Sequence, residues 1–169
     1  MNHKRLLTID DEEAIQIVIK FGINMAAGWE VLSASDGRMG IDTAQREIPD
    51  AILLDVMMPE MDGIATFKAL QANPITAGIP VIFLTAKAQA AERRQFNDLG
   101  VSGVITKPFN SLDLPDRIVK ILNWWKQKMT IQGKMVRIAR PTDRLDEVVR
   151  FYTQGLGLQI LDRFENHQG

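Results

Sequence analysis

The sequence predicts an α/β fold in which a (βα)5 array builds a doubly wound parallel sheet. Two observations carry this prediction. Short runs of apolar and β-branched residues recur through the first two-thirds of the chain, each bounded by acidic, glycine or proline residues. Amphipathic stretches with helical periodicity lie between these runs. Short apolar strands that alternate with helices are typical of a parallel sheet covered by helices on both faces.

The expected elements alternate along the chain. The predicted strands cover Leu6–Ile9, Glu30–Ala34, Ala51–Leu54, Val81–Leu84 and Gly103–Thr106. The predicted helices cover Glu12–Ala27, Asp36–Glu47, Ile64–Ala72, Ala88–Leu99 and Ser111–Lys126. Gly28 and Gly100 come directly after two of these helices and supply the left-handed residue at which a helix commonly ends.

The composition describes a globular chain with room for one full domain. Its 169 residues are too few for two domains of ordinary size, and 46% of them are hydrophobic. The net charge of -1 provides no general basic field, and no DNA-binding domain is visible. Cysteine is absent, which excludes disulfides, thiol nucleophiles and thiolate metal sites. No apolar run has the length of a signal or membrane-spanning segment, so we expect a cytoplasmic protein without membrane contact.

The pattern changes after Trp125, and this change predicts a second, smaller segment. We expect the first domain at residues 1–128 and a polar linker at residues 129–133. Residues 134–169 then read as strand, helix and strand, a βαβ-like extension.

Polar side chains stand where four of the predicted strands end. Asp10 and Asp11 follow the first strand, Asp55 the third and Thr85 the fourth, and Lys107 lies just past the fifth. Ligands of open α/β sheets bind outside the carboxyl ends of the strands. We therefore expect these five side chains to converge at one edge of the sheet.

This set of residues suits phosphoryl chemistry. Three adjacent carboxylates repel one another unless a cation neutralises them, and an oxygen-only site favours Mg²⁺. Asp55 can then act as a carboxylate nucleophile that forms an acyl phosphate. Lys107 supplies a positive charge and Thr85 a hydroxyl donor for the phosphoryl oxygens.

Four stretches carry these residues: Asp10 to Glu13, Leu53 to Gly63, Leu84 to Ala86 and Thr106 to Phe109. In residue type, order and spacing they resemble the receiver domains of CheY-like response regulators. The resemblance covers about Lys4 to Lys126. It implies the flavodoxin-like strand order 2-1-3-4-5.

The resemblance also implies how the site works. Asp55 would accept a phosphoryl group from a histidine kinase or a phosphotransfer protein. Asp11 and Asp55 would ligate Mg²⁺ directly, Asp10 through water, and the backbone carbonyl of Met57 would be a further ligand. The chain would then be a response regulator of a two-component phosphorelay, a phospho-acceptor rather than an enzyme, which signals to a downstream protein target through altered protein contacts.

Further positions carry implications of the same resemblance. Thr85 and Lys107 would engage the phosphoryl group, and Pro108 stands where the family usually has a cis-proline. Val104 occupies a position that is aromatic in many receivers. Met57 and Lys87 occupy two variable positions that tune the phosphoryl lifetime. Because Met57 has no polar group to orient an attacking water, we expect slow self-dephosphorylation.

The C-terminal extension has a resemblance of its own. It is carried by Val136 to Pro141, Arg150 to Tyr152, Gly155 to Leu158 and Arg163 to Glu165. These stretches resemble the opening βαβ part of a glyoxalase/bleomycin-resistance (vicinal-oxygen-chelate) module, which needs further strands to close its sheet. An unclosed module would leave an unpaired strand edge, which favours a homodimer through this fragment. The alternative function is a regulatory receiver fused to part of a metalloenzyme or binding module that a partner chain completes.

Overall fold

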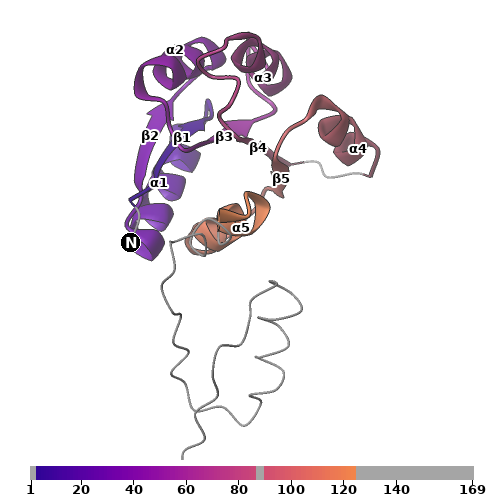
Figure 1. Cartoon of the computed structure of the whole chain (residues 1–169). Helices are drawn as coiled ribbons and strands as arrows, with labels where there is room; N and C mark the ends of the chain where they lie inside the picture. Colours follow the sequence, from indigo (N-terminus) through magenta and orange to yellow (C-terminus); the bar gives the residue numbers. More distant parts are fainter. Residues whose placement is uncertain (1–2, 87–89, 125–169) are drawn as a thin grey trace, which may run out of the picture. The chain divides into compact units, whose positions relative to one another are not determined.

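Five parallel strands alternate with helices in the part of the chain that the computed structural model describes, residues 3–86 and 90–124 (Figure 1). These residues belong to the first of two compact units, Met1–Ile131. The strand order is β2-β1-β3-β4-β5, so the predicted order is confirmed. The expected domain limits at 128 and 134 and the βαβ-like extension lie outside the described residues.

The elements follow the predicted sequence of strands and helices. The strands are β1 Arg5–Ile9, β2 Glu30–Ala34, β3 Ala51–Asp55, β4 Val81–Thr85 and β5 Gly103–Thr106. The helices are α1 Glu13–Ala27, α2 Gly37–Glu47, α3 Gly63–Ala72, α4 Ala90–Leu99, the 3-10 turn η1 Ser111–Asp113 and α5 Leu114–Ile121. Gly28 and Gly100 have positive φ angles of 65° and 87°, which confirms both as the predicted helix stops.

The sheet separates two apolar layers. Because successive side chains of a strand point to opposite faces, Phe83 of β4 packs on one side of the sheet and its neighbours Ile82 and Leu84 pack on the other. Helices α2, α3 and α4 cover the first face, and α1 and α5 cover the second (Figure 1). Both faces of each central strand are therefore buried, as the apolar runs of the sequence predict.

The last predicted helix, Ser111–Lys126, is divided in the structure. The Asn110 side chain accepts a hydrogen bond from the backbone N–H of Leu112, which stabilises the tight η1 turn. Pro115 lies in the first turn of α5, where its missing N–H costs no helical hydrogen bond. Asn123 has a φ of 52° and follows the end of α5. The prediction of one continuous helix was therefore wrong at its start and, within the described residues, at its end.

None of the helices in the described ranges combines the length and the apolar character needed to cross a membrane.

Candidate functional site

Neighbouring strands bring the predicted acidic residues to one edge of the sheet. β1 and β3 pair in parallel with Ile9 opposite Leu54, so Asp10 and Asp55 take the next position on adjacent strands. Because successive side chains of a strand point to opposite faces, both acids belong to the face of the sheet that α1 and α5 cover. Asp10 is fully buried and Asp55 is only 4% exposed. The expectation that these two carboxylates meet is confirmed.

Asp11 completes a compact cluster with Asp10 and Asp55. One carboxylate oxygen of each residue lies within 4.8 Å of the other two. Asp11 is exposed, whereas its two partners are buried, so the cluster opens to solvent on the Asp11 side. An all-oxygen donor set with an open side fits a hard cation such as Mg²⁺, which keeps several of its waters when it binds to protein.

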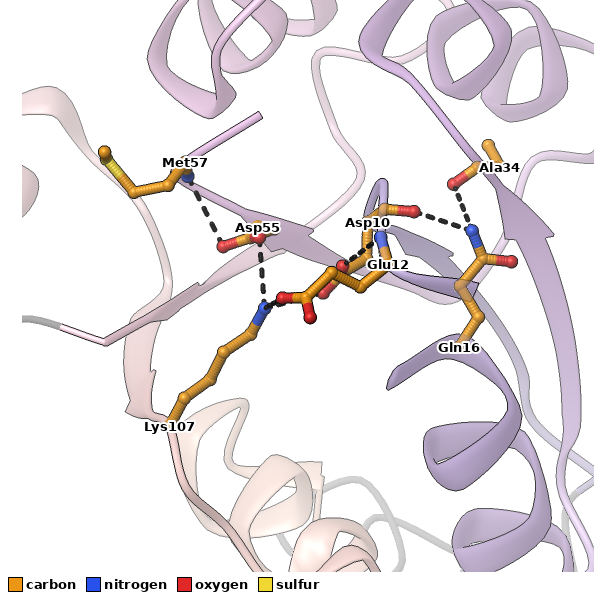
Figure 2. A network of polar contacts seen from close by, with 7 residues as sticks. All are labelled: Asp10, Glu12, Gln16, Ala34, Asp55, Met57 and Lys107. Carbon is orange, nitrogen blue, oxygen red and sulfur yellow. Dashed lines mark hydrogen bonds and ion pairs between the residues drawn. The ribbon is translucent and has the colours of Figure 1, made fainter. Parts of the chain in front are cut away.

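Lys107 lies between the two buried carboxylates (Figure 2). Its Nζ is 2.8 Å from Asp10 Oδ2 and 3.0 Å from Asp55 Oδ2, and it is 3.9 Å from Glu12 Oε1. The backbone N–H of Lys107 donates to the Thr85 carbonyl over 2.8 Å, which continues the β4–β5 pairing to the start of the next loop. Its bond to Pro108 is cis, as the resemblance implies.

The surroundings of the site raise the pKa of both Asp55 and Lys107. Burial raises the pKa of Asp55, although the hydrogen bond and the charge of Lys107 oppose this shift. For Lys107, burial lowers the pKa, but the hydrogen bonds and the charges of Asp10 and Asp55 outweigh burial and raise it overall. Three carboxylates beside one ammonium group leave the site with an excess of negative charge, which favours a cation there.

Two backbone N–H groups orient the buried carboxylates. The N–H of Glu12 donates to Asp10 Oδ1 over 2.9 Å. The N–H of Met57 donates to Asp55 Oδ1 over 3.4 Å, which leaves Oδ2 facing Lys107 (Figure 2). Each carboxylate is thus held by one backbone donor and by the same ammonium group.

The remaining predicted residues lie around this cluster. Thr85 is the last residue of β4 and is 3% exposed, and its neighbour Leu84 pairs with Asp55. The side chain of Met57 is 68% exposed. Val104 is half-buried and packs against the apolar layer under α2, α3 and α4. Lys87 lies outside the described residues. A metal-ligand role for the Met57 carbonyl stays a prediction.

Gln16 belongs to the site, although the sequence analysis did not single it out. Its Nε2 donates to the backbone carbonyls of Asp10 and Ala34 (Figure 2). Gln16 stands four residues after Glu12, and side chains of a helix lean toward its N-terminus. This spacing is a signal that could have pointed to it.

The sequence of residues 6–119 matches the family model of the response regulator receiver domain. The chain belongs to the response regulator receiver family. Receivers of this family are phosphoacceptor signalling domains, and an acidic cluster such as Asp10, Asp11 and Asp55 is typical of their phospho-accepting sites. A second model, a YycE-like N-terminal domain, matches residues 136–169, the segment with the second predicted resemblance. Neither match is to a DNA-binding domain.

Curated relatives of this receiver are longer proteins. The alkaline phosphatase synthesis transcriptional regulatory protein PhoP of Bacillus subtilis is 35% identical over 120 residues, which are 71% of this chain and 49% of that protein. The DNA-binding dual master transcriptional regulator RpaA of Synechocystis is 37% identical over 164 residues, which are 95% of this chain and 61% of that protein. The chain therefore spans about half the length of the curated relatives it matches.

Solved receiver structures have the same fold. The chemotaxis protein CheY4 of Vibrio cholerae superposes with a TM-score of 0.66 at 28% identity, over 70% of this chain and 98% of that one. A response regulator from Desulfuromonas acetoxidans gives a TM-score of 0.64 at 28% identity, over 72% of this chain and 98% of that one.

Proposed function

We propose that Asp55 is the phosphoryl acceptor of this receiver and that Mg²⁺ is its cofactor. One observation carries the proposal: the Asp55 carboxylate shares a 4.8 Å cluster with Asp10 and Asp11 while its Oδ2 lies 3.0 Å from Lys107 Nζ. Asp55 therefore has neighbouring carboxylates that can bind a divalent cation, and an ammonium group that can bind phosphoryl oxygens. Acidic clusters without such a lysine are common on protein surfaces.

The transfer step needs Asp55 as the nucleophile. One carboxylate oxygen of Asp55 forms a bond to phosphorus while the bond from phosphorus to the donor's nitrogen or oxygen breaks, and the leaving group takes the electron pair. Lys107 is already within hydrogen-bond distance of Asp55 Oδ2, so its ammonium stands ready for the arriving phosphoryl oxygens. The hydroxyl of Thr85 is the second donor that we assign to them.

The acidic residues would hold the metal. Asp11 and Asp55 would ligate it directly, Asp10 through water, and the Met57 carbonyl would add a further oxygen. When bound, Mg²⁺ supplies positive charge that offsets the carboxylates and the phosphoryl group. Because Lys107 contacts both Asp10 and Asp55, its charge offsets part of the cluster's negative charge.

Labelling with a small phosphodonor tests this proposal. The intact mass of the protein is measured after incubation with acetyl phosphate and Mg²⁺, and the mass should rise by one phosphoryl group. The Asp55→Asn variant and a sample with chelator should show no gain. The matched control is Asp42→Asn, which changes an exposed carboxylate on α2 and should label like the wild type. Labelling of the Asp55→Asn variant equal to that of the wild type would contradict the assignment of Asp55 as the phosphoryl acceptor.

The exposed Met57 side chain bears on the phosphoryl lifetime. It stands two residues after Asp55 and is 68% exposed, so water reaches this side of the acceptor but meets no polar side chain at position 57. We infer slow self-dephosphorylation. A Met57→Asn variant, labelled with acetyl phosphate and transferred to donor-free buffer, should lose its phosphoryl group faster than the wild type. Loss at the same rate would count against this inference.

We propose that a histidine kinase or a phosphotransfer protein donates the phosphoryl group and that α1 offers it a contact surface. A helix that packs on a sheet is usually apolar on its buried face alone. Helix α1 additionally carries exposed apolar residues with helical spacing: Ala14, Ile17, Val18, Phe21 and Met25. We call this set the α1 stripe. A groove of about 810 Å³ beside α1 adds Trp29, which precedes β2, and Leu32 of β2.

The α1 stripe starts next to the acid cluster, because α1 begins three residues after Asp10. A donor that presents a phosphohistidine to Asp55 must approach this edge of the sheet, so we assign the α1 stripe to a helix of the histidine kinase or phosphotransfer protein. For a kinase that phosphorylates the wild type, Phe21→Asp should slow transfer at least tenfold and leave labelling by acetyl phosphate unchanged. Ile75→Asp, at an exposed site after α3, is the control. Unchanged transfer to Phe21→Asp would remove this assignment.

The segment after the receiver has a separate proposed role. We propose a receiver at residues 1–128, a linker at 129–133 and a glyoxalase-like fragment at 134–169 that joins two chains in a cytoplasmic protein. The match of residues 136–169 to a YycE-like N-terminal domain supports a module distinct from the receiver. Mass in solution, measured with and without residues 130–169, tests the dimer, and two monomers would exclude it. Signalling to a downstream protein would then run through phosphorylation-dependent contacts of the receiver.

A further inference from the structure

Gln16 links helix α1 to the ends of two strands. Its side chain is half-buried, and its Nε2 donates to the backbone carbonyl of Asp10 over 2.6 Å and to that of Ala34 over 3.2 Å. The two carbonyls belong to the carboxyl ends of β1 and β2, and Figure 2 shows the amide of Gln16 reaching them from α1. A single amide therefore spans the gap at which these strands separate.

The position of this amide is set by the strand ladder. The β1–β2 register ends with the pair Ile9 and Ala34, and the Asp10 N–H still donates to the Ala34 carbonyl over 3.1 Å. After Asp10 the chain turns away from β2 into α1. At the Asp10 carbonyl, Gln16 supplies the donor that a strand would otherwise supply. Its bond takes the place of one further rung of the ladder.

Asp10 is consequently fixed at four points. Its N–H is held by Ala34, its carbonyl by Gln16, its Oδ1 by the Glu12 N–H and its Oδ2 by Lys107. Removing Gln16 frees only the carbonyl, the one point that sets the plane of the peptide leading into the next residue.

That next residue is Asp11, and it depends on this peptide. In the part of the chain that the structure describes, no hydrogen bond or ion pair fixes the exposed Asp11 side chain. One of its carboxylate oxygens lies within 4.8 Å of those of Asp10 and Asp55, and the backbone at Asp11 sets the point from which the side chain reaches them. The orientation of the Asp10–Asp11 peptide therefore decides whether the third carboxylate faces the other two.

We propose that Gln16 is a positioning residue of the metal site, and that its amide aligns Asp11 for Mg²⁺ by fixing the Asp10 carbonyl. The inference rests on the proposed function, since it assigns a partner to the metal ligands named there. Residues that hydrogen-bond to metal ligands without touching the metal change metal affinity by roughly 10- to 100-fold when they are replaced.

The test measures Mg²⁺ binding directly by calorimetry on the full chain. Gln16→Met keeps the length and the helix preference of the side chain but removes its N–H donors. We expect the Mg²⁺ Kd to rise about tenfold. The labelling rate with acetyl phosphate should fall at low Mg²⁺ and return to within about twofold of the wild type at saturating Mg²⁺, because Gln16 touches neither donor nor acceptor. Gln45→Met, a half-buried glutamine on α2, is the matched control.

Two further variants separate positioning from general stability. Gln16→Arg keeps N–H donors on a longer stem and should recover part of the lost affinity, whereas Gln16→Glu, which only accepts, should not. The amide resonances of Asp10 and Asp11 should shift in Gln16→Met and not in Gln45→Met. If Gln16→Met binds Mg²⁺ as tightly as the wild type, the inference fails. If the wild type itself binds no Mg²⁺, the proposed function fails instead.

Discussion

Lys107 Nζ lies 2.8 Å from Asp10 Oδ2 and 3.0 Å from Asp55 Oδ2, so one ammonium group bridges two buried carboxylates. This bridge compensates two carboxylates that are 0% and 4% exposed at the residue level. Loss of one partner from a buried ion pair leaves the other charge uncompensated. The stability of this receiver should therefore depend on Lys107 most strongly when no metal is present.

Lys107→Gln should lower the free energy of unfolding of the metal-free protein by about 2 kcal/mol, because it removes the ammonium and leaves both carboxylates close together. Addition of Mg²⁺ should recover most of this loss. Thermal unfolding with chelator and with Mg²⁺ measures both effects. Lys120→Gln, at an exposed site on α5, should change neither value. A loss that is the same with and without Mg²⁺ would argue against a shared site.

Asp55→Asn should have the opposite effect on the metal-free protein. Burial raises the pKa of Asp55 above 3.8 in the folded state, so the folded protein binds this proton more tightly than the unfolded chain does. The associated stability is fully present below pH 3.8 and is lost as the pH rises through the folded pKa. At neutral pH the charged Asp55 therefore costs stability, and its replacement removes that cost.

We expect Asp55→Asn to raise the free energy of unfolding at pH 7 by on the order of 1 kcal/mol without metal, and the gain to shrink as the pH falls toward 4. Denaturant unfolding in chelator over this pH range measures it. Asp42→Asn on the surface of α2 should show a smaller and flatter difference. A destabilised Asp55→Asn protein at pH 7 would contradict the sign derived from burial.

Gly63 determines how closely α3 approaches the acceptor. A Cβ at this position would collide with the Asp55 carbonyl oxygen and would lie 2.7 Å from the Val56 Cα. The Gly63 N–H also donates to the Val56 carbonyl over 3.0 Å, so the loop cannot move away without losing that bond. The backbone that carries Asp55 is therefore packed against α3 without room for a methyl group.

Gly63→Ala should cost about 2–3 kcal/mol of stability and reduce labelling of Asp55, because the backbone of the acceptor must shift to admit the methyl group. Gly78→Ala is the control, since a Cβ there meets no atom within 4 Å. It should be neutral or gain a few tenths of a kcal/mol. Chemical denaturation and acetyl phosphate labelling measure the two variants. Equal stability of both would contradict the close packing.

The sequence was sufficient to predict that Asp10, Asp11, Asp55 and Lys107 meet, because all four stand where predicted strands end. Apolar runs locate β1 and β3, and the acid after each run is then placed by the parallel pairing. Gln16 was not predicted because its amide donates to two backbone carbonyls, those of Asp10 and Ala34. A sequence does not show which backbone groups lie within reach of a side chain. The division of the last helix was missed for a related reason. The Asn110 cap and the positive φ of Asn123 are local backbone choices, which helical periodicity does not reveal.

Ile48 is a further backbone feature that the apolar pattern does not predict. It ends α2 with a φ of 44°, in the left-handed region that β-branched residues rarely adopt, and its side chain is 62% exposed. Ile48→Gly should raise the free energy of unfolding by roughly 1 kcal/mol, because the relieved strain exceeds the entropic cost of glycine. Ile75→Gly removes a similarly exposed isoleucine without a positive φ and should destabilise the protein. Thermal unfolding of both variants measures these changes in stability. A less stable Ile48→Gly protein would contradict backbone strain at position 48.

Thr8 and Thr76 are both 0% exposed, but only one of their hydroxyls is paired. Among the described residues, Thr8 Oγ1 has no hydrogen-bond partner, whereas Thr76 Oγ1 donates to the Leu70 carbonyl over 2.7 Å. Valine has the shape of threonine without the hydroxyl, and it favours a strand such as β1. Removing a buried hydroxyl without a partner avoids its desolvation cost, whereas removing a paired one leaves an acceptor unsatisfied.

Thr8→Val should therefore be neutral or raise the free energy of unfolding by up to about 1 kcal/mol, whereas Thr76→Val should lower it by about 1–2 kcal/mol. Urea unfolding of the two variants beside the wild type measures the contrast. Because Thr8 precedes Asp10 by two residues on the same face of β1, labelling by acetyl phosphate should also be followed. A Thr8→Val protein that is less stable than Thr76→Val would contradict the view that the Thr8 hydroxyl lacks a partner.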